Sequence, residues 1–389
     1  MVCSLAFKLH LAPEDDLLTN PDSKSREAFD QLLDLLRELS ERYAGSEWLV
    51  QEPDDVGEAL RAVLHLLEAA LLTRVESSPA HPWLREFPLP TRKFLGDNAD
   101  AIYYETAISP DHSYRIRGNM AGAAYVSITI EAGAPDGGFS QKTAGVINDT
   151  QFDVAEDGSF EIRIGGEPAP RNWLAMSPDA CRIMTRHYYE DEFPAAMKPR
   201  HIDFQIEVLD PEAPPSPPND ANVAAAIRRV ANFMKTSMLD MGPPPRENQP
   251  DFVSRIPNEF PKPVKPGDFG LAAADAAYSM APFMLPPGQT LLIEGRWPED
   301  CRSANVCLWN RHMQTFDYLN RQVTLNRKQT KLEADGSFRL VVAADDPGLP
   351  NWLDTEGRSF GLVFFRYMLP EGEIEQPRAR LVSIDSLRS

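Results

Sequence analysis

Cysteine is scarce in this sequence, and its spacing excludes the common zinc and redox motifs. Cys3, Cys181, Cys301 and Cys307 are the four cysteines of 389 residues, and no two of them form a C-x-x-C pair. So few thiols in so long a chain favour a reducing compartment over a disulfide framework. The seven histidines are scattered, with no two at metal-ligand spacing on one element. We therefore expect a cytoplasmic protein that holds no transition metal.

Positive charge and long apolar runs are also lacking. Lysine and arginine number 39 against 58 aspartates and glutamates, which gives a net charge of −19. Nucleic-acid backbones and anionic membrane surfaces attract clustered basic residues, so neither is an expected partner. No apolar run approaches the roughly 18 residues of a membrane span, and residues 1–12 lack the features of a signal peptide. Glycine-rich nucleotide loops, the H-E-x-x-H motif and the G-x-S-x-G elbow are missing too, so we expect no cofactor.

What the sequence does contain is an internal repeat. Residues 155–160 (AEDGSF) and 333–338 (EADGSF) are each followed, at nearly equal spacing, by Asn-Trp-Leu and then by an arginine. These later residues are Asn172-Trp173-Leu174 with Arg186, and Asn351-Trp352-Leu353 with Arg366. A fainter likeness links Asp100-Ala101-Ile102-Tyr103 to Asp275-Ala276-Ala277-Tyr278. A β unit that occurs twice is therefore the organising feature of the chain.

Length and composition predict more than one domain. The chain is too long for one ordinary core, and its 42% hydrophobic and 25% charged residues are typical of soluble globular proteins. We predict a mainly β protein with two tandem, related antiparallel β-sandwich or jelly-roll-like domains. The expected divisions are a helical region at 1–90, a first sandwich at 91–210, a proline-rich linker with a helix at 211–270 and a second sandwich at 271–389.

Three stretches show the three- and four-residue apolar spacing of amphipathic helices. They are residues 24–43, about 54–74 and about 219–239. A short polar link joins the first two, which favours an antiparallel helical hairpin. Its wide apolar face would either pack on the β body or form a dimer, and we favour packing.

Apolar runs between turn signals predict the strands. In the first half we expect one hairpin of 113–119 with 123–131, a second hairpin of 152–155 with 159–164, and strands at 183–189 and 202–208. In the second half we expect strands at 290–296, 304–309, 330–333, 337–343 and 360–367.

The repeated residues are interpreted mainly as scaffold. The two Asp-Gly pairs suit tight turns, because glycine reaches positive φ without strain. Trp173 and Trp352 suit core positions, and a Trp beside an Asn can alternatively bind a sugar or a flat ligand. Arg186 and Arg366 end apolar strands, where a guanidinium pairs with a carboxylate or forms an anion site.

Polar residues found in only one copy are freer to carry chemistry. In the dense stretch 308–318, His312 and Asp317 would form an oriented base with Tyr318 as the acid. The alternative is a polar strand edge with a solvated histidine. Asp97, Asp100 and Glu105 would offer carboxylates to calcium or serve as turn caps. The candidate ligand-binding residues are Trp309, Asn310, Arg321, Asn351, Trp352, Arg366, Tyr104 and Tyr188.

Several stretches resemble the family of bacterial proteins called domain of unknown function 1214. In the first half they are 94–103, which begins FLGDNAD, and 114–118 (YRIRG); in the second half they are 325–327, 334–338 and 346–355 with Arg366. The resemblance covers most of residues 90–370 and is closer in the second half. It implies a β-sandwich or jelly-roll-like fold similar to carbohydrate-active folds, and it carries no settled activity or catalytic residues.

Two main functions follow as hypotheses. The first is an enzyme that uses cofactor-free acid–base chemistry, of the lyase, hydrolase or isomerase type, at a site between the halves. Its substrate would be a small, partly apolar molecule such as a terpenoid, steroid or glycoside. The second is a non-catalytic protein that binds a carbohydrate or small ligand in a shallow groove lined by Trp173, Trp352 or Trp309. A third possibility is an assembly role for residues 24–74, which would make the protein a homo-oligomer.

Overall fold

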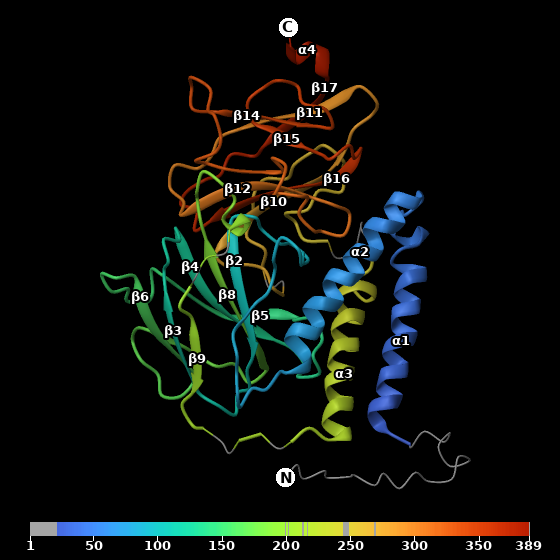
Figure 1. Ribbon diagram of the computed structural model, residues 1–389. Helices are drawn as coiled ribbons and strands as arrows, with labels where there is room; N and C mark the ends of the chain where they lie inside the picture. The colour runs from blue at the N-terminus through green and yellow to red at the C-terminus, as the bar shows by residue number, and fades with distance from the viewer. Residues whose placement is uncertain are drawn as a thin grey trace, which may run out of the picture.

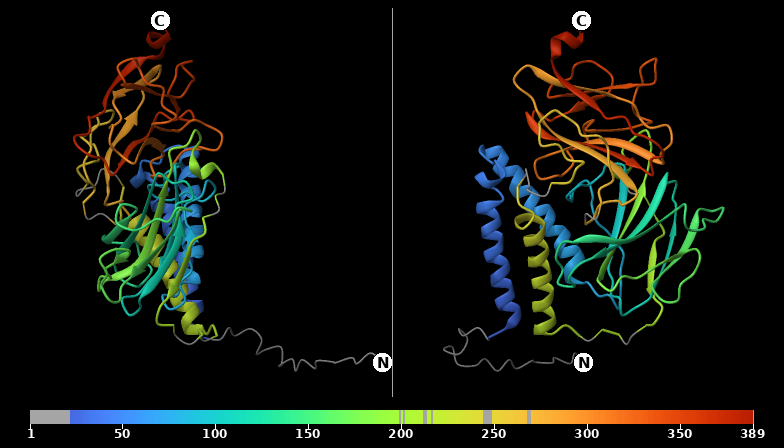
Figure 2. Two further views of the ribbon diagram at one scale, coloured as in Figure 1. Left: turned by 90° about the vertical axis from the view of Figure 1, so that its left-hand side faces the viewer. Right: turned by 180° about the vertical axis from the view of Figure 1, so that it is seen from behind.

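The protein is mostly β, with two β-sandwiches and a layer of helices beside them (Figure 1). The computed structural model describes residues 22–198, 200, 202–211, 214–215, 217–243, 249–267 and 270–388. Cys3 and parts of the proline-rich stretches at 211–218 and 243–266 lie outside the described residues. The two sandwiches are stacked end to end, and the helices lie along one side of the first sandwich and reach the second (Figures 1 and 2).

Two sheets pack face to face in the first sandwich. The inner sheet has the order β1-β2-β8-β4-β5 and the outer sheet the order β7-β6-β3-β9. A core of apolar side chains such as Ile128, Ile162 and Ile183 lies between them. The inner strands are Arg85–Glu86, Ala101–Ala107, Ala180–Tyr188, Tyr125–Ala132 and Lys142–Asn148, and the outer strands are Trp173–Leu174, Ser159–Ile164, Tyr114–Asn119 and Gln205–Val208, each in sheet order.

The second sandwich repeats this topology strand for strand. Its inner sheet has the order β10-β16-β12-β13 and its outer sheet the order β15-β14-β11-β17, so only the short β1 lacks a counterpart. In both copies the short outer strand, β7 or β15, runs parallel to its neighbour. The inner strands are Ala276–Met284, Phe360–Met368, Ser303–Trp309 and Thr324–Asn326; the outer strands are Trp352–Asp354, Phe338–Ala343, Gln289–Gly295 and Arg378–Ser383, followed by α4 (Ile384–Arg388).

The repeated residues occupy equivalent places, which confirms the predicted doubled β-sandwich. Gly158 and Gly336 have φ of 83° and 82°, in turns where the preceding aspartate accepts a hydrogen bond from the following serine N–H. Asn172 and Asn351 both have positive φ and accept hydrogen bonds through their side-chain amides from loop N–H groups. The indole N–H groups of the two tryptophans both donate to backbone carbonyls, those of Gly165 and Ala343.

Some of the predicted strand pairings are wrong. Residues 113–119 and 123–131 were expected to form a hairpin, but β3 and β4 belong to different sheets, and the turn between them carries the chain across the sandwich. Residues 152–155 and 330–333 form no strand. Period-two alternation identifies a strand with one buried face, but it does not identify the neighbouring strand.

Three long helices form the helical layer, with bounds close to the predicted ones. They are α1 (Lys24–Arg42), α2 (Pro53–Ala70) and α3 (Asp220–Met234), and the last two each continue into a π-turn, at Leu71–Val75 and Lys235–Leu239. The expected hairpin packs differently from the prediction, because α1 contacts α3 most extensively rather than α2. Asp220 at the start of α3 accepts hydrogen bonds from Ser23 and Ser25 at the start of α1, which joins the two amino-terminal ends.

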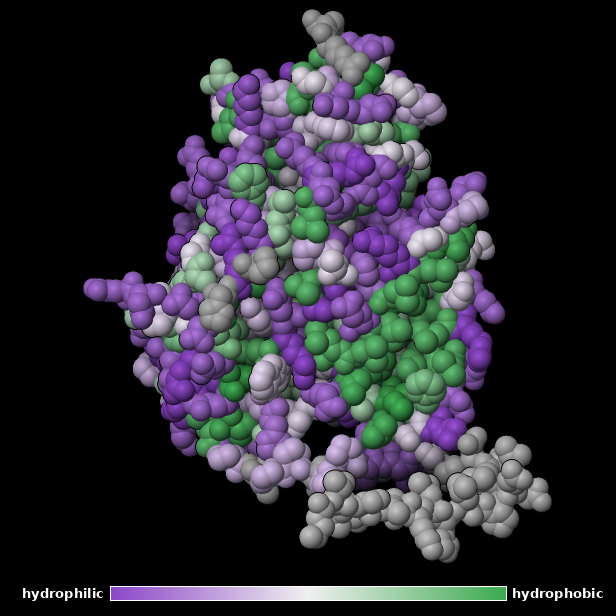
Figure 3. All heavy atoms as spheres, in the orientation of Figure 1, coloured by the Kyte–Doolittle hydropathy of each residue, from purple (hydrophilic) through white to green (hydrophobic). Residues whose placement is uncertain are grey.

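The helices pack on the β body, as favoured from the sequence. Leu66 of α2 and Phe233 of α3 share one buried cluster with Tyr103 of the first sandwich and Trp309 of the second. On the solvent side the helices keep a hydrophobic band, which Figure 3 shows as a green area over the helical layer. The exposed large apolar side chains of these helices and the π-turn after α2 are Phe29, Leu33, Val56, Leu64, Leu71 and Val223.

A buried ion cluster attaches the end of α2 to the first inner sheet. Glu105 of β2 accepts hydrogen bonds from Arg74 and from Arg182, each at 2.7 Å, and all three side chains are buried. The Arg74 guanidinium also lies 4.2 Å from the ring centroid of Phe233 on α3. Burial alone would raise the pKa of Glu105, but the two arginines outweigh it and lower that pKa.

A separate set of polar contacts joins the two sandwiches. Asp100 of the first sandwich is buried and accepts a hydrogen bond from Asn305 of β12 at 2.9 Å. Asp97, three residues earlier, accepts hydrogen bonds from the backbone and hydroxyl of Thr315. Burial raises the pKa of Asp100 to about 7. These bonds, rather than a linker alone, fix the orientation of the second sandwich.

Replacing Glu105 with glutamine will destabilise the fold by about 3–5 kcal/mol, because two arginines then stay buried without a counter-charge. The control is Glu207→Gln, which removes half-exposed ion pairs with Arg115 and Arg117 and should cost less than about 1 kcal/mol. Urea unfolding measures both. Equal losses in the two variants would contradict the structural role of the cluster.

Asp100 makes stability depend on pH between about 4 and 7. Its folded pKa of about 7 lies above the roughly 3.9 of an unfolded aspartate, so the native state holds a proton that the unfolded chain has lost. Its contribution to stability therefore falls as pH rises through this interval, by a few kcal/mol in order of magnitude. Asp100→Asn should show a flatter profile of urea midpoint against pH. A variant profile parallel to that of the wild type would disprove the assignment.

Candidate functional site

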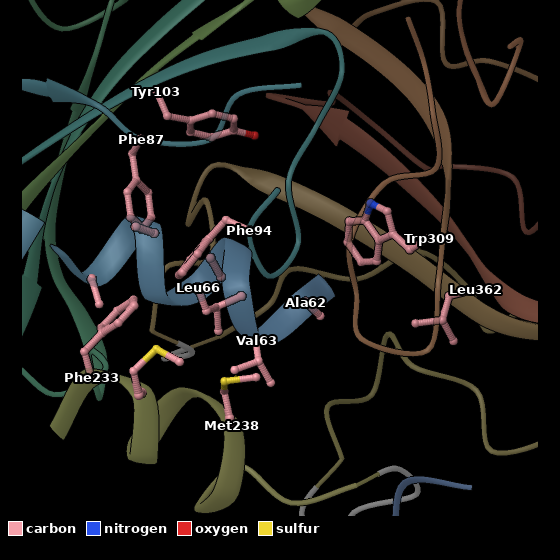
Figure 4. Packing of buried hydrophobic residues seen from close by; sticks show 14 of the residues in the cluster. Ala62, Val63, Leu66, Phe87, Phe94, Tyr103, Phe233, Met238, Trp309 and Leu362 are labelled. Atoms are coloured by element: carbon pink, nitrogen blue, oxygen red, sulfur yellow. The ribbon is translucent and has the colours of Figure 1, made fainter. Parts of the chain in front are cut away.

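The inner face of the second sandwich, the end of the helical layer and two loops enclose an apolar cavity of about 300 Å³. Figure 4 shows part of the surrounding cluster, with Phe94 and the α2 residues Leu66 and Val63 on one side and Trp309 and Leu362 of the second sandwich on the other. The loop around 249–257, the residues at 270–272 and the Trp48-Leu49 turn complete the walls. The side chains that the inner sheet contributes to the lining include Tyr278, Met280, Trp309, Leu362, Phe364 and Arg366.

The two copies differ in what lies on this face of the inner sheet. Tyr103 pairs with Arg186 in the first copy, and Tyr278 pairs with Arg366 in the second, so the strand registers can be matched position by position. Matching them places Trp309 where the first copy has Glu131, and Leu362 where it has Arg182. In the same way, Met280 replaces Glu105 and Cys307 replaces Thr129. The second copy therefore retains the arginine and has lost the charged residues around it.

Arg186 has polar partners within the protein. Its guanidinium donates to the hydroxyl of Thr129 at 2.7 Å and to the carbonyl of Leu271 at 2.8 Å. The carboxylate of Glu131 lies 3.8 Å away and is itself completely buried. This arginine has the structural role that the sequence analysis gave as one of its two interpretations.

Arg366 is buried with far fewer partners. Its side chain is 4% exposed, and one guanidinium nitrogen donates to the carbonyl of Gly96 at 3.1 Å. Its Nε and Nη1 atoms have no hydrogen-bond partner among the described residues. The rest of its environment is aromatic: the guanidinium lies 4.7 Å from the ring centroid of Phe364, and farther from those of Tyr278 and Trp309.

Three buried tyrosines surround the two arginines. Tyr278 lines the cavity, and its hydroxyl oxygen accepts a hydrogen bond from the N–H of Ala273, which leaves the phenolic proton free to be donated. Tyr103 and Tyr188 lie edge to face behind it, with ring centroids 6.2 Å apart. Burial raises the pKa values of Tyr103 and Tyr278, so both are neutral donors near neutral pH.

The predicted acid–base group is not formed as expected. Both ring nitrogens of His312 lack partners among the described residues, so the expected hydrogen bond to Asp317 is absent. His312 is instead buried against the rings of Tyr43 and Trp48, and burial lowers its pKa to about 3. Asp317 caps its own turn by accepting from Leu319 and Asn320. The turn at 310–314 separates the two side chains, which five residues of sequence spacing could not reveal.

The other predicted site residues divide into two groups. Trp309 and Arg366 line the cavity, and Tyr188 lies just behind it. The remaining residues do not line it. Tyr318 packs under the ammonium of Lys93, and Tyr104 packs on Phe204. Asn310 caps a turn, Arg321 pairs with Asp354, and Asn351 and Trp352 hold the outer-sheet loop through hydrogen bonds.

The sequence analysis missed most of the cavity wall, including Tyr278, Phe364 and Met280. One available signal was the echo of Tyr103 in Tyr278, which was noted as part of the repeat and not as a site. The others are apolar residues on strands, which look like core residues until the structure shows that a cavity adjoins them.

The described residues contain no group of three metal-ligating side chains, and Asp97, Asp100 and Glu105 bind different protein partners rather than converging. Their carboxylates accept hydrogen bonds from Thr315, from Asn305 and from two arginines, respectively. No helix among the described residues is both long enough and apolar enough to cross a membrane.

Comparison with solved structures supports the fold. An uncharacterised protein from Burkholderia cenocepacia has 25% sequence identity and a TM-score of 0.81, with 93% of this chain and 98% of that chain covered. A second protein, from Vibrio parahaemolyticus, has 12% identity and a TM-score of 0.47, with 83% and 98% covered. No curated protein matches the chain.

The family comparison bears out the resemblance and locates it. The matched segment begins at Tyr103 and ends after β8, within the first sandwich, rather than in the second half where the likeness was expected to be closer. The model of the family described as Protein of unknown function (DUF1214) thus matches residues 103–192, within the first β-sandwich.

Proposed function

We propose that this protein binds a small, largely apolar molecule in the cavity on the inner face of the second sandwich. The observation that carries the proposal is the contrast between the copies: the same sheet face is charged and packed in the first copy, and apolar and open in the second. Core burial alone would favour filling such a space, because an empty apolar cavity costs stability.

The size and lining of the cavity are consistent with this function. About 300 Å³ is at the lower end of the range of roughly 300–1,000 Å³ in which small molecules bind. Trp309 and Phe364 stack with centroids 4.4 Å apart and offer a flat aromatic wall. The neighbouring Arg366 and Tyr278 supply a few polar groups that would orient a ligand.

A neutral apolar probe tests the proposal. N-phenyl-1-naphthylamine should bind with one site per chain and gain fluorescence, and Val253→Trp should abolish binding because the indole fills the cavity from a loop. The control is Leu319→Trp, on an exposed turn away from the cavity lining, which should leave binding unchanged. Absence of saturable binding, or equal binding by the wild type and Val253→Trp, would refute the proposal.

An enzyme that uses acid–base chemistry is the second candidate, and Tyr278 is the observation that favours it. Its phenolic proton is free to be donated into the cavity beside the positive charge of Arg366, as a general acid requires. This chemistry would need no cofactor, in line with the expectation from the sequence. The acid would then be Tyr278, and not the expected group of His312, Asp317 and Tyr318.

Product analysis separates the two candidates. Terpenoid, steroid and glycoside candidates that bind should be incubated with the wild-type protein and with Tyr278→Phe, and the mixtures analysed by mass spectrometry. The enzyme hypothesis expects product from the wild type and a loss of at least about 100-fold in the variant with binding retained. Binding without any product would leave the non-catalytic function.

A further inference from the structure

Arg366 is a charged side chain whose N–H groups are mostly without hydrogen-bond acceptors in the part of the chain that the structure describes. It is buried, it borders the cavity, and two of its three guanidinium nitrogens have no partner. A guanidinium remains charged at any physiological pH. A buried charge without a counter-charge is costly, so such a residue is expected to serve a purpose other than stability.

The charge balance of the cavity is opposite to that of the whole protein. The chain carries a net charge of −19, yet among the described residues that line the cavity there are arginines and no aspartate or glutamate. Arg311, at the cavity wall, already has a counter-ion in Asp55 at 2.8 Å. Arg366 is the buried arginine of the lining, and no carboxylate of the described residues is within ion-pair distance of it.

The first sandwich shows how the same arginine is neutralised when no ligand is needed. There Glu131 supplies the negative charge for Arg186 from the adjacent strand. In the second sandwich the equivalent strand position is Trp309, which offers a ring in place of the carboxylate.

Aromatic faces stabilise a guanidinium only partly, by less than the desolvation penalty of burying its charge. The buried Asp97 acts on Arg366 electrostatically, but it is not within ion-pair distance and its carboxylate accepts hydrogen bonds from Thr315. No carboxylate of the described residues therefore accepts from Nε and Nη1 of Arg366, and a bound anion would fill that place.

We propose that the cavity ligand is a monocarboxylic acid with an apolar body, whose carboxylate binds Arg366 in the place that Glu131 occupies in the first copy. This inference rests on the proposed function, because it names the chemical class of the ligand of that same cavity. The free Nε and Nη1 atoms donate to the carboxylate oxygens, and the hydroxyl of Tyr278 is a further donor on the cavity wall. The apolar body lies against Trp309, Phe364 and Leu362.

The test compares ligands that differ only in the head group. Decanoic acid is paired with 1-decanol, and 1-naphthoic acid with 1-naphthalenemethanol, at pH 7.5, where both acids are ionised. Calorimetric titration gives the ratio of the Kd of the alcohol to the Kd of the acid. The expected ratio is about 10 to 100 for the wild type, because charge-assisted hydrogen bonds in a desolvated site distinguish the two head groups.

Two variants of Arg366 assign the preference to its side chain. Arg366→Met matches the apolar side chains of neighbouring positions, and Arg366→Gln keeps a donor without the charge, so at least one is expected to fold. Both should bring the ratio to about 1 while the neutral probe N-phenyl-1-naphthylamine still binds. The matched control is Arg321→Gln, which removes an arginine that pairs with Asp354 and does not line the cavity, and which should keep the wild-type ratio.

The outcomes distinguish this inference from the proposed function. A wild-type ratio near 1 with saturable probe binding would overturn the carboxylate assignment and leave the binding function intact. A high ratio that persists in both Arg366 variants would overturn it as well. Loss of binding by every probe, including the neutral one, would refute the binding function together with the inference. A high ratio lost in the Arg366 variants and kept in Arg321→Gln supports it.

Discussion

The structure depends on one constraint: each β-sandwich has an inner sheet whose second face must also be buried. The outer sheets already cover one face of each inner sheet through separate cores. The other faces are buried together, against each other and against α2 and α3, in a shared cluster that includes Tyr103, Phe233 and Trp309. Removing this apolar area from water contributes about 25 cal/mol per Å², so the three layers stabilise one another. The cavity adjoins this cluster, between the inner sheet of the second sandwich and the loops at 249–257 and 270–272.

Charges in the shared core follow from the same burial. In a medium of low dielectric constant a charge needs a partner, and the first sandwich provides it within the chain: Glu105 faces Arg74 and Arg182, and Glu131 faces Arg186. The second sandwich has replaced both carboxylates with apolar residues and has kept one arginine. In the first copy these buried charges are thus paired within the chain, and the pair of Glu105 with Arg74 attaches its inner sheet to the end of α2. The other copy provides an apolar site with one unbalanced charge.

The sequence predicted the features that depend on local chemistry. The Asp-Gly turns at Gly158 and Gly336 need only a residue that tolerates positive φ. The spacing from these turns to the Asn-Trp pairs shows the duplication from the sequence alone. The amphipathic helices were placed within a few residues, because a single apolar stripe defines each of them. The predicted ranges include the π-turns that end α2 and α3, but the sequence did not show that the backbone changes there from α to π.

The features that were missed depend on contacts between distant segments. Alternation could not show that β3 and β4 lie in different sheets, since both have one face in the same core. The proximity of His312 and Asp317 in sequence suggested a pair, but the intervening turn buries the histidine against Tyr43 from the helical layer. The sequence allowed a carboxylate pair or an anion site for Arg186 and Arg366 alike, and it could not show how the surroundings of the two differ, because they are the same residue in the same repeat.

The two arginines also correct the reasoning by which residues shared by both copies were assigned to scaffold. That reasoning compares side-chain identity, whereas the energy of a buried charge depends on what surrounds it. Arg186 and Arg366 occupy the same strand position and both pair with a tyrosine across the sheet. They differ because the adjacent strand carries Glu131 in one copy and Trp309 in the other. After a duplication, replacing the partner is enough to change the role of a residue that itself stays the same. The comparison on which the proposed function rests is therefore between matched environments, position by position along the paired strands.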